Sequence, residues 1–410
     1  MHSEATCAGT IASMKLNRFT VRGTAKTRIP RPVVALGAVS LMNDTSSEMV
    51  FPLLPLFLRS LGAPPALIGL IEGVAETTAS LLKLFSGWLA DRLGNHRLLA
   101  FLGYALAAFT RPLLAFANVP MQVLGLRFID RFGKGVRAAP RDALIAVSTA
   151  PENRGLAFGF HRAMDNLGAA IGPALAALIL LFAPENYRLV FLIAAVPALL
   201  SLGVFWWGVR DAPVLPRSAA KHPLSGAWGL LKGRFGWYLG CVLVFTLGNS
   251  SDAFLLMRAQ DVGAPVALAP LLWMGLNLLR SAFSVYGGWL ADRYGRLLTL
   301  RWGWLCYALV YAGFGFANAL WQIVGLFALY AVFYALTEGA ERALVAEFAP
   351  AERSGQAYGL FHFVVGIAAL PASVLFGWLW QTFGAPVAFL TGAGLALTAA
   401  LGVSALGRGD

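Results

Sequence analysis

Long apolar segments alternate with short polar ones along almost the whole chain. Hydrophobic runs follow a polar, basic stretch at residues 1–31, and a second polar stretch at 210–236 divides them into two sets of six. The runs lie at 33–58, 66–90, 98–117, 121–147, 155–182, 189–209, 237–257, 268–291, 297–317, 320–346, 357–383 and 385–406. Because a helix needs about 20 apolar residues to cross a bilayer, these runs predict an all-α integral membrane protein with 12 transmembrane helices.

The expected domain organisation follows from the same pattern. Residues 1–31 form a basic tail and residues 32–209 an N-terminal six-helix bundle. Residues 210–236, which contain several prolines and basic residues, form a linker, and residues 237–410 form a C-terminal six-helix bundle.

The composition excludes a water-soluble globular protein. Hydrophobic residues make up 58% of the chain and charged residues only 13%, with a mean hydropathy of +0.68. Soluble domains carry about 25% charged residues. The sequence pI is near 10.0, but the basic residues are spread between apolar segments instead of forming one basic domain. No nucleic-acid partner is therefore expected.

The distribution of basic residues predicts the orientation in the membrane. With the tail and the linker on one side, most Lys and Arg outside the apolar runs fall on that side, and only Arg59, Arg188 and Arg258 fall on the other. Since basic loops stay in the cytoplasm, both termini are expected to be cytoplasmic. We expect a bacterial-type inner (plasma) membrane.

An internal repeat relates the two halves. The hexamer Gly-Trp-Leu-Ala-Asp-Arg occurs at 87–92 and again, unchanged, at 288–293. Gln122 and Gln322 also correspond at a spacing of 200 residues. Two copies of a six-helix unit in parallel repetition are therefore expected.

These repeated loops resemble the G-x-L-a-D-r-x-G-r-r pattern between helices 2 and 3 of the major facilitator superfamily, and the resemblance covers the chain after the tail. It implies a 12-helix transporter fold in which Asp91 and Asp292 latch the two halves in one access state. The matching residues are Gly87, Asp91, Arg92, Gly94 and Arg97 in the first copy, and Gly288, Asp292, Arg293, Gly295 and Arg296 in the second. Asn95 and His96 replace basic residues of the pattern in the first copy.

A small-residue motif lies in the run at 155–182. Gly168, Gly172 and Pro173 resemble the G-x-x-x-G-P element of proton-linked exporters in that family, although Ala176 and Ala177 stand where glycines are usual. Glycines at this spacing also pack ordinary membrane helices against each other. The motif favours export without excluding a purely structural role.

Charged residues inside the apolar runs mark candidate sites, because a charge at the bilayer centre costs at least ~2.5–3.5 kcal/mol. The first half carries more of them than the second. At ~100° per residue, the charges of the run at 121–147 lie on one helix face. The candidate cavity or substrate residues are Arg111, Arg127, Asp130, Arg131, Lys134, Arg137 and Asp165. Salt bridges among them are the structural alternative.

A carboxylate without a permanent cation can carry a proton in a poorly hydrated site. Asp44, Glu72 and Glu76 are the candidates for proton coupling. Glu72 is expected to lie nearer the hydrated outer end of its helix than Glu76. Asp44 lies in the polar segment 43–48, followed by Pro52 and Pro55, and this arrangement predicts an interrupted helix beside a cavity.

Aromatic residues of the second half are candidates for an amphiphile site, with helix packing as the alternative: Trp273, Tyr330, Phe333, Tyr334 and Phe361. The sequence lacks a G-x-x-x-x-G-K-[ST] phosphate loop and paired Cys/His metal spacings. Neither coupling to ATP nor a metal or other cofactor is therefore expected.

Together these observations predict a secondary active transporter that moves a small organic solute by alternating access, with proton-coupled efflux as the first interpretation. A proton-coupled uptake permease for an organic anion is the second, and an integral-membrane enzyme is the alternative of another class. The expected partners are a small-molecule substrate, protons and membrane lipid, and the chain is expected to be monomeric and not an enzyme.

Overall fold

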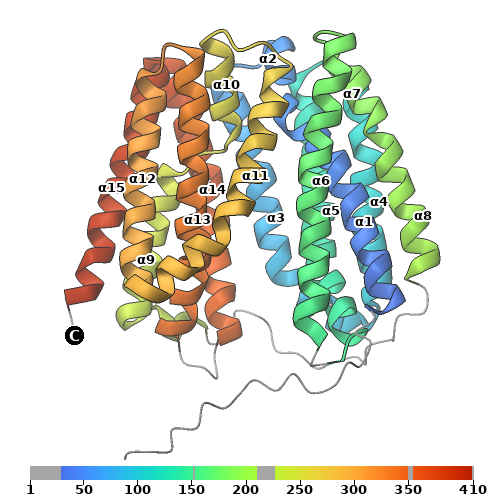
Figure 1. The fold of residues 1–410 in the computed structure, drawn as a ribbon, viewed down its shortest axis with the longest axis horizontal. Coiled ribbons are helices and arrows are strands. Elements are labelled where there is room, and N and C mark those ends of the chain that lie inside the picture. The colour runs from blue at the N-terminus through green and yellow to red at the C-terminus, as the bar shows by residue number, and fades with distance from the viewer. Residues whose placement is uncertain (1–28, 151–152, 210–226, 350–353, 409–410) are drawn as a thin grey trace, which may run out of the picture.

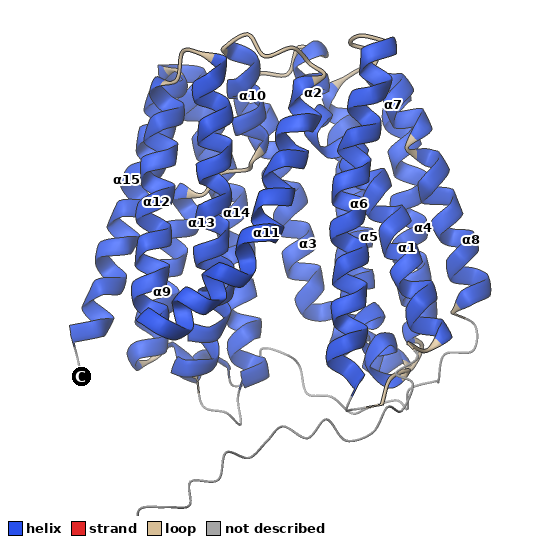
Figure 2. Cartoon of the chain, in the orientation of Figure 1, coloured by secondary structure: helices blue, strands red, loops and turns tan. Residues whose placement is uncertain are grey.

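The computed structural model describes residues 29–150, 153–209, 227–349 and 354–408. The regular elements of these residues are all helices (Figure 2). Most of the expected tail at 1–31 and the first part of the expected linker at 210–236 lie outside the described residues. The last part of that linker is helical, since a 3-10 turn η4 covers Ala227–Leu231 and α9 begins at Gly233.

The helices of the first half pack into one bundle, drawn from blue to green in Figure 1. They are α1 (Arg31–Val50), η1 (Phe51–Leu53), α2 (Leu54–Ser60), α3 (Pro65–Leu93), α4 (His96–Leu113), η2 (Leu114–Phe116), α5 (Pro120–Val147), α6 (Arg154–Phe182), α7 (Tyr187–Ile193) and α8 (Ala195–Gly208).

The helices of the second half form a bundle beside the first (Figure 1). They are α9 (Gly233–Gly248), α10 (Ala253–Asp261), α11 (Leu268–Tyr294), α12 (Arg296–Phe316), α13 (Leu320–Phe348), α14 (Ser354–Phe383) and α15 (Ala385–Ser404), with a final turn η6 (Ala405–Arg408).

These elements form twelve passes, as the hydrophobic pattern predicts. In the described part of the chain, nine spans are long and apolar enough to cross a membrane, and the bent helix α11 is a tenth. The other two passes are α1–η1–α2 and α5, in which polar and charged residues interrupt the apolar sequence.

Three passes are broken near their middle, one of them at Ala194 between α7 and α8, and the other two beside polar segments. The first of these two changes from α-helix to a 3-10 turn at Phe51–Leu53, where Pro52 lies, and the sequence predicted this interruption. The second is broken between α9 and α10, over residues 249–252. The hydrophobic pattern predicts one continuous run there, because this segment contains no proline. Irregular backbone at membrane depth needs protein or water as a partner; the break at 51–53 follows the polar segment 43–48, and the break at 249–252 contains polar residues itself.

The sequence repeat gives the same hydrogen bond at the starts of α5 and α13. Gln122 Oε1 accepts a hydrogen bond from the backbone N–H of Asn118 at 2.8 Å, and Gln322 Oε1 accepts one from Asn318 at 2.7 Å. Each glutamine therefore satisfies a backbone donor just before its helix. The matched spacing in the sequence reflects the same cap used twice.

Glycines set the contact between the halves along α3 and α14. A Cβ atom on Gly73 would lie 3.0 Å from the Leu370 backbone, and one on Gly69 would overlap the Ser373 carbonyl. A Cβ on Gly377 would overlap the Pro65 carbonyl. We refer to this contact, formed by Gly69, Gly73, Gly366 and Gly377, as the α3–α14 seam. Its backbones approach closely because these positions lack side chains.

Candidate functional site

One face of α5 carries the charged residues that the sequence placed together. Arg127, Asp130, Arg131 and Arg137 are buried, whereas Phe128, Ile129 and Phe132 are exposed on the outside of the bundle. An apolar side that is exposed on the outside of a helix bundle is suited to contact with lipid. The charged face of α5 is turned toward other helices. Lys134 lies between the buried charges along the sequence but is exposed.

Ion pairs and hydrogen bonds connect this face to three other helices. Arg127 Nη2 lies 3.2 Å from Glu72 Oε2 of α3 and Arg127 Nη1 lies 3.7 Å from Asp130 Oδ2. Arg111 of α4 donates to Asp130 Oδ1 at 3.2 Å and to the Asn43 carbonyl of α1 at 2.9 Å. The contacts join α1, α3, α4 and α5 in one network, so part of the predicted array has a structural role.

The two carboxylates of α3 differ from the expectation. Both lie next to an arginine of α5, because Arg131 Nε is 3.6 Å from Glu76 Oε1 and Arg127 contacts Glu72. The Glu72 side chain is only 2% exposed, whereas that of Glu76 is 47% exposed. The expectation that Glu72 is the more hydrated of the two is wrong, since the neighbouring helices cover it regardless of its place along α3.

Glu48 on α1 is a carboxylate that the sequence analysis did not select. Its Oε2 accepts a hydrogen bond of 2.6 Å from the Trp273 indole of α11, in the opposite half. In the described part of the chain no ion pair within 4 Å neutralises it. Asp44, one turn earlier, accepts a hydrogen bond from Asn43 Nδ2 at 3.0 Å. The sequence alone could not show that Glu48 lacks an ion pair, because this depends on which helix faces α1.

The glycines of the export-type motif pack directly on this polar segment. A Cβ on Gly168 would lie 2.6 Å from the Leu41 carbonyl and 3.0 Å from Asp44 Cβ, and one on Gly172 would overlap the Thr45 carbonyl. Pro173 lies inside α6, directly after Gly172. The motif therefore brings α6 into backbone contact with α1 where Asp44 and Glu48 lie.

Asp165 and Arg137 lie apart from the Glu72–Arg127–Asp130 contacts. Asp165 on α6 accepts a hydrogen bond from Ser40 of α1 and lies 3.5 Å from His161 and 3.6 Å from Arg162. The Arg137 guanidinium lies over the Tyr104 ring at 4.6 Å from its centroid. These two predicted residues thus contact separate partners.

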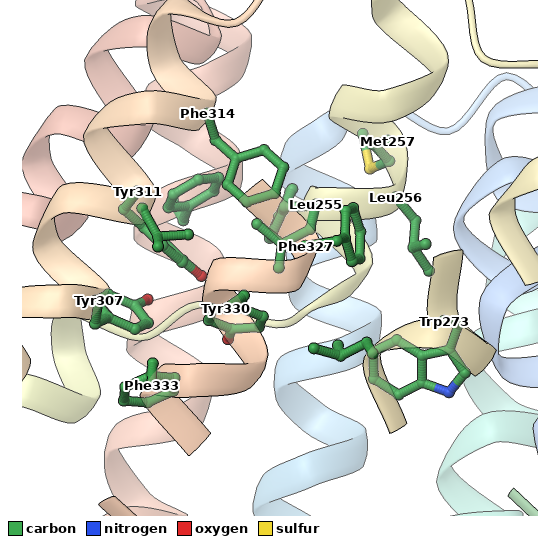
Figure 3. Close-up of a cluster of buried hydrophobic side chains, with 14 of the residues drawn as sticks. Leu255, Leu256, Met257, Trp273, Tyr307, Tyr311, Phe314, Phe327, Tyr330 and Phe333 are labelled. Carbon is green, nitrogen blue, oxygen red and sulfur yellow. The ribbon is translucent and has the colours of Figure 1, made fainter. Parts of the chain in front are cut away.

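The second half contains a polar group surrounded by aromatic rings. Asp252, at the break before α10, accepts hydrogen bonds from the hydroxyls of Tyr330 at 2.7 Å and Tyr334 at 2.8 Å. Arg280 of α11 forms two hydrogen bonds with Glu338 of α13, at 3.1 and 2.5 Å. Figure 3 shows Tyr330 and Phe333 of α13 beside Tyr307 and Tyr311 of α12.

A short repeat could have revealed this group. Ser46-Ser47-Glu48 in the first pass matches Ser250-Ser251-Asp252 in the seventh. Each acid accepts hydrogen bonds from aromatic side chains, from Trp273 in one case and from two tyrosines in the other. The two halves therefore place an acid with neutral aromatic donors at matching points.

The latch-motif loops turn at glycines. Gly94 and Gly295 have φ angles of +66° and +94°, which L side chains rarely adopt. Arg92 lies over the Trp88 ring at 5.5 Å and Arg293 over the Trp289 ring at 5.2 Å, so the repeated hexamer makes the same contact twice.

The charges of the second loop are exposed. Asp292 and Arg293 are exposed, and Arg296 forms a 3.0 Å ion pair with Glu347. In the first loop, Arg97 donates to the Trp206 carbonyl at 3.1 Å. The side chain of Asp91 and the surroundings of Gly87 lie outside what the structure describes.

Comparison with known proteins identifies the family. The sequence profile described as Major Facilitator Superfamily matches residues 36–279 and 253–408. The chain belongs to the major facilitator superfamily. An uncharacterized MFS-type transporter of Methanocaldococcus jannaschii is 32% identical over 381 residues, which cover 91% of this chain and 94% of the relative.

Two further comparisons agree with this assignment. Multidrug resistance protein MdtH of Cronobacter sakazakii is 26% identical over 341 residues, covering 81% of this chain and 82% of that protein. The crystal structure of the nucleoside transporter NupG superposes with a TM-score of 0.76 at 15% identity, covering 92% of this chain and all of that one. Members of the superfamily are multi-pass membrane transporters of small molecules, not enzymes, and commonly function as monomers.

Proposed function

We propose that this transporter exports a small organic solute in exchange for protons. The observation that carries the proposal is the hydrogen bond between Glu48 of the first half and Trp273 of the second. A carboxylate without an ion pair can gain or lose a proton, and here the same group contacts the opposite half. Protonation of Glu48 would replace an ionised acceptor by a weaker neutral one, which links proton binding to the separation of the halves.

The charged surroundings of Glu48 are compatible with this role. Asp44 on α1 and Arg131 and Lys134 on α5 lie within its electrostatic reach. Gly172 of α6 packs against Glu48, since a Cβ there would lie 2.9 Å from Glu48 Cβ, and from α11 the neutral indole of Trp273 donates to it. The nearby cations belong to α5 and are shared with Glu76. Asp44, Glu72 and Glu76 remain further candidates for the proton.

Export is favoured over uptake by two observations. The motif Gly168-x-x-x-Gly172-Pro173 packs on the segment that contains Asp44 and Glu48, and relatives such as MdtH are named multidrug resistance proteins. We place the transporter in a bacterial-type inner membrane with both termini cytoplasmic, because Arg59, Arg188 and Arg258 are the only basic residues expected on the other side.

Proteoliposomes with an acidic interior test the proposal. An exporter that exchanges solute for protons should accumulate at least one member of a dye panel, comprising a cationic, a neutral and an anionic dye, as protons leave. Glu48→Gln keeps an acceptor for Trp273 but cannot titrate, so gradient-driven accumulation should be lost while solute exchange without a gradient persists.

Glu185→Gln is the matched control, since it removes one exposed carboxylate in the loop between α6 and α7. It should retain at least half of the wild-type accumulation. Wild-type accumulation that is independent of the pH gradient would contradict proton coupling. If dye accumulation by Glu48→Gln still depended on the pH gradient as in the wild type, the coupling carboxylate would be Asp44, Glu72 or Glu76 instead.

A further inference from the structure

Asp252 has an unusual set of partners for an acid within a membrane protein. It lies at the break between α9 and α10, where its carboxylate receives two hydroxyl donors, from Tyr330 and Tyr334. In the described part of the chain it has no ion pair within 4 Å. A carboxylate held by neutral donors keeps its capacity to attract a cation.

Arg280, a basic residue within electrostatic reach of Asp252, already has a partner. Its guanidinium forms two hydrogen bonds with Glu338 and lies 4.1 Å from the centroid of the Tyr334 ring. A bidentate arginine–carboxylate pair is charge-neutral. When Asp252 is ionised, Arg280, Glu338 and Asp252 together carry one negative charge, which is located on Asp252.

This charge is reachable and faces the first half. Asp252 and Tyr334 are half-buried, not enclosed, and the side chains of Arg280 and Glu338 are 32% and 37% exposed. Glu76 of the first half lies within electrostatic reach of Asp252, and its side chain is 47% exposed. Polar groups of both halves are thus exposed on sides that face each other at mid-span.

The opposing face does not supply an uncompensated positive charge. Lys134 is exposed there and has no ion pair within 4 Å in the described ranges, but Asp44, Glu48 and Glu76 all lie within its electrostatic reach. Of these three acids, only Glu76 has an arginine within 4 Å among the described residues. The charge balance between the halves therefore favours a cationic solute over an anionic one.

Aromatic rings hold the Asp252 group in place. The Tyr330 ring stacks on Phe333 at 5.4 Å and meets Tyr334 edge-on at 5.0 Å, and Tyr307 meets Phe333 at 4.9 Å. Tyr307 and Tyr330 are fully buried (Figure 3). Because the rings cannot turn freely, the hydroxyls stay aimed at the carboxylate, which preorganises the site.

We infer that Asp252, positioned by Tyr330 and Tyr334, binds the cationic group of a lipophilic organic cation. The role of this Asp252 site in transport rests on the proposed export function, but binding of the cation at equilibrium does not require a proton gradient. Cation binding at Asp252 and proton-coupled export can therefore be contradicted by separate experiments.

Equilibrium binding to the full chain in nanodiscs tests the inference with two probes of nearly the same shape and opposite charge. Tetraphenylphosphonium should bind to the wild type at least tenfold more tightly than tetraphenylborate, after subtraction of binding to empty nanodiscs. Asp252→Asn should weaken tetraphenylphosphonium binding at least tenfold. Tyr334→Phe, which removes one hydroxyl donor, should weaken it about two- to fivefold.

Two further variants control for folding and for net charge. Asp252→Glu keeps the negative charge and should retain tetraphenylphosphonium binding within about threefold of the wild type. If Asp252 had only a structural role, Asp252→Glu would not restore binding of the cation selectively. Glu185→Gln removes one exposed negative charge in the α6–α7 loop and should leave binding unchanged. Equal binding of the two probes by the wild type, or unchanged tetraphenylphosphonium binding in a folded Asp252→Asn protein, would overturn the inference.

Discussion

Arg59 of α2 and Asp261 of α10 form a 2.7 Å ion pair that joins the two halves at the end where α2 and α10 lie (Figure 1). Arg59 also lies 3.4 Å from Gln260 Oε1 and 3.5 Å from the Met257 carbonyl. Both charged side chains are 27% exposed, and partly exposed pairs contribute about 0.2–1 kcal/mol. This ion pair is therefore weak enough to break in each transport cycle.

Breaking this pair should make that end open more often. Asp261→Asn is expected to raise the reactivity of a cysteine at Met257, which is fully buried beside Arg59, toward a water-soluble thiol reagent about 1.5- to 5-fold, corresponding to the loss of about 0.2–1 kcal/mol. The charge swap of Arg59→Asp with Asp261→Arg should restore the wild-type reactivity. A swap that behaves like the single variants would show that the pair does not hold the halves together.

The burial of Glu72 predicts a stability difference between the two acids of α3. Glu72→Gln leaves Arg127 buried with one fewer negative partner, and breaking a buried pair costs about 3–5 kcal/mol. Glu76→Gln should cost less than about 1 kcal/mol, because that side chain is 47% exposed. Thermal unfolding in detergent measures both. A larger loss for Glu76→Gln would contradict the burial argument.

Gly172 on α6 predicts a packing effect that a neighbouring glycine does not share. A Cβ at Gly172 would overlap the Thr45 carbonyl, whereas a Cβ at Gly159 on the same helix meets nothing within 4 Å. Overpacking costs about 1–3 kcal/mol, so Gly172→Ala should lower the unfolding temperature and reduce transport. Gly159→Ala should leave both near wild type. Similar behaviour of the two variants would show that close α1–α6 packing is not required.

The latch motif predicts an asymmetric effect on transport. Asp91→Asn keeps the size of the side chain but removes its charge, and we expect severe loss of transport with normal membrane insertion. Asp292 is exposed, and Asp292→Asn should reduce transport less. Flux into proteoliposomes at matched protein content measures both variants. A greater loss for Asp292→Asn would reverse this ranking, and full activity of Asp91→Asn would remove the latch role.

The twelve passes could be predicted because span length depends on local composition, which the sequence shows directly. The charged face of α5 could also be predicted, since helical periodicity fixes which residues of one helix point the same way. The partners of Glu72 and Glu76 could not, because they depend on how α3 and α5 rotate against each other. Glu48 could not be identified from the sequence for the same reason, because its donor Trp273 lies 225 residues away in sequence.

The break at residues 249–252 shows a different limit. The first broken pass contains Pro52, which lacks a backbone N–H donor and therefore predicts the interruption. The seventh pass has only Asn249, Ser250, Ser251 and Asp252 at the break, and these residues occur in intact membrane helices as well. Tertiary contacts such as the hydrogen bonds from Tyr330 and Tyr334 to Asp252 stabilise this break.

The α3–α14 seam has a thermodynamic consequence. Ordering a long side chain costs up to about 2 kcal/mol of rotamer entropy, whereas glycine has no rotamers to order. At Gly69, Gly73 and Gly377 the halves meet through backbone atoms. When one half moves against the other along this seam, few side chains there exchange one rotamer for another. Little conformational entropy is therefore gained or lost at these positions in either direction of the movement.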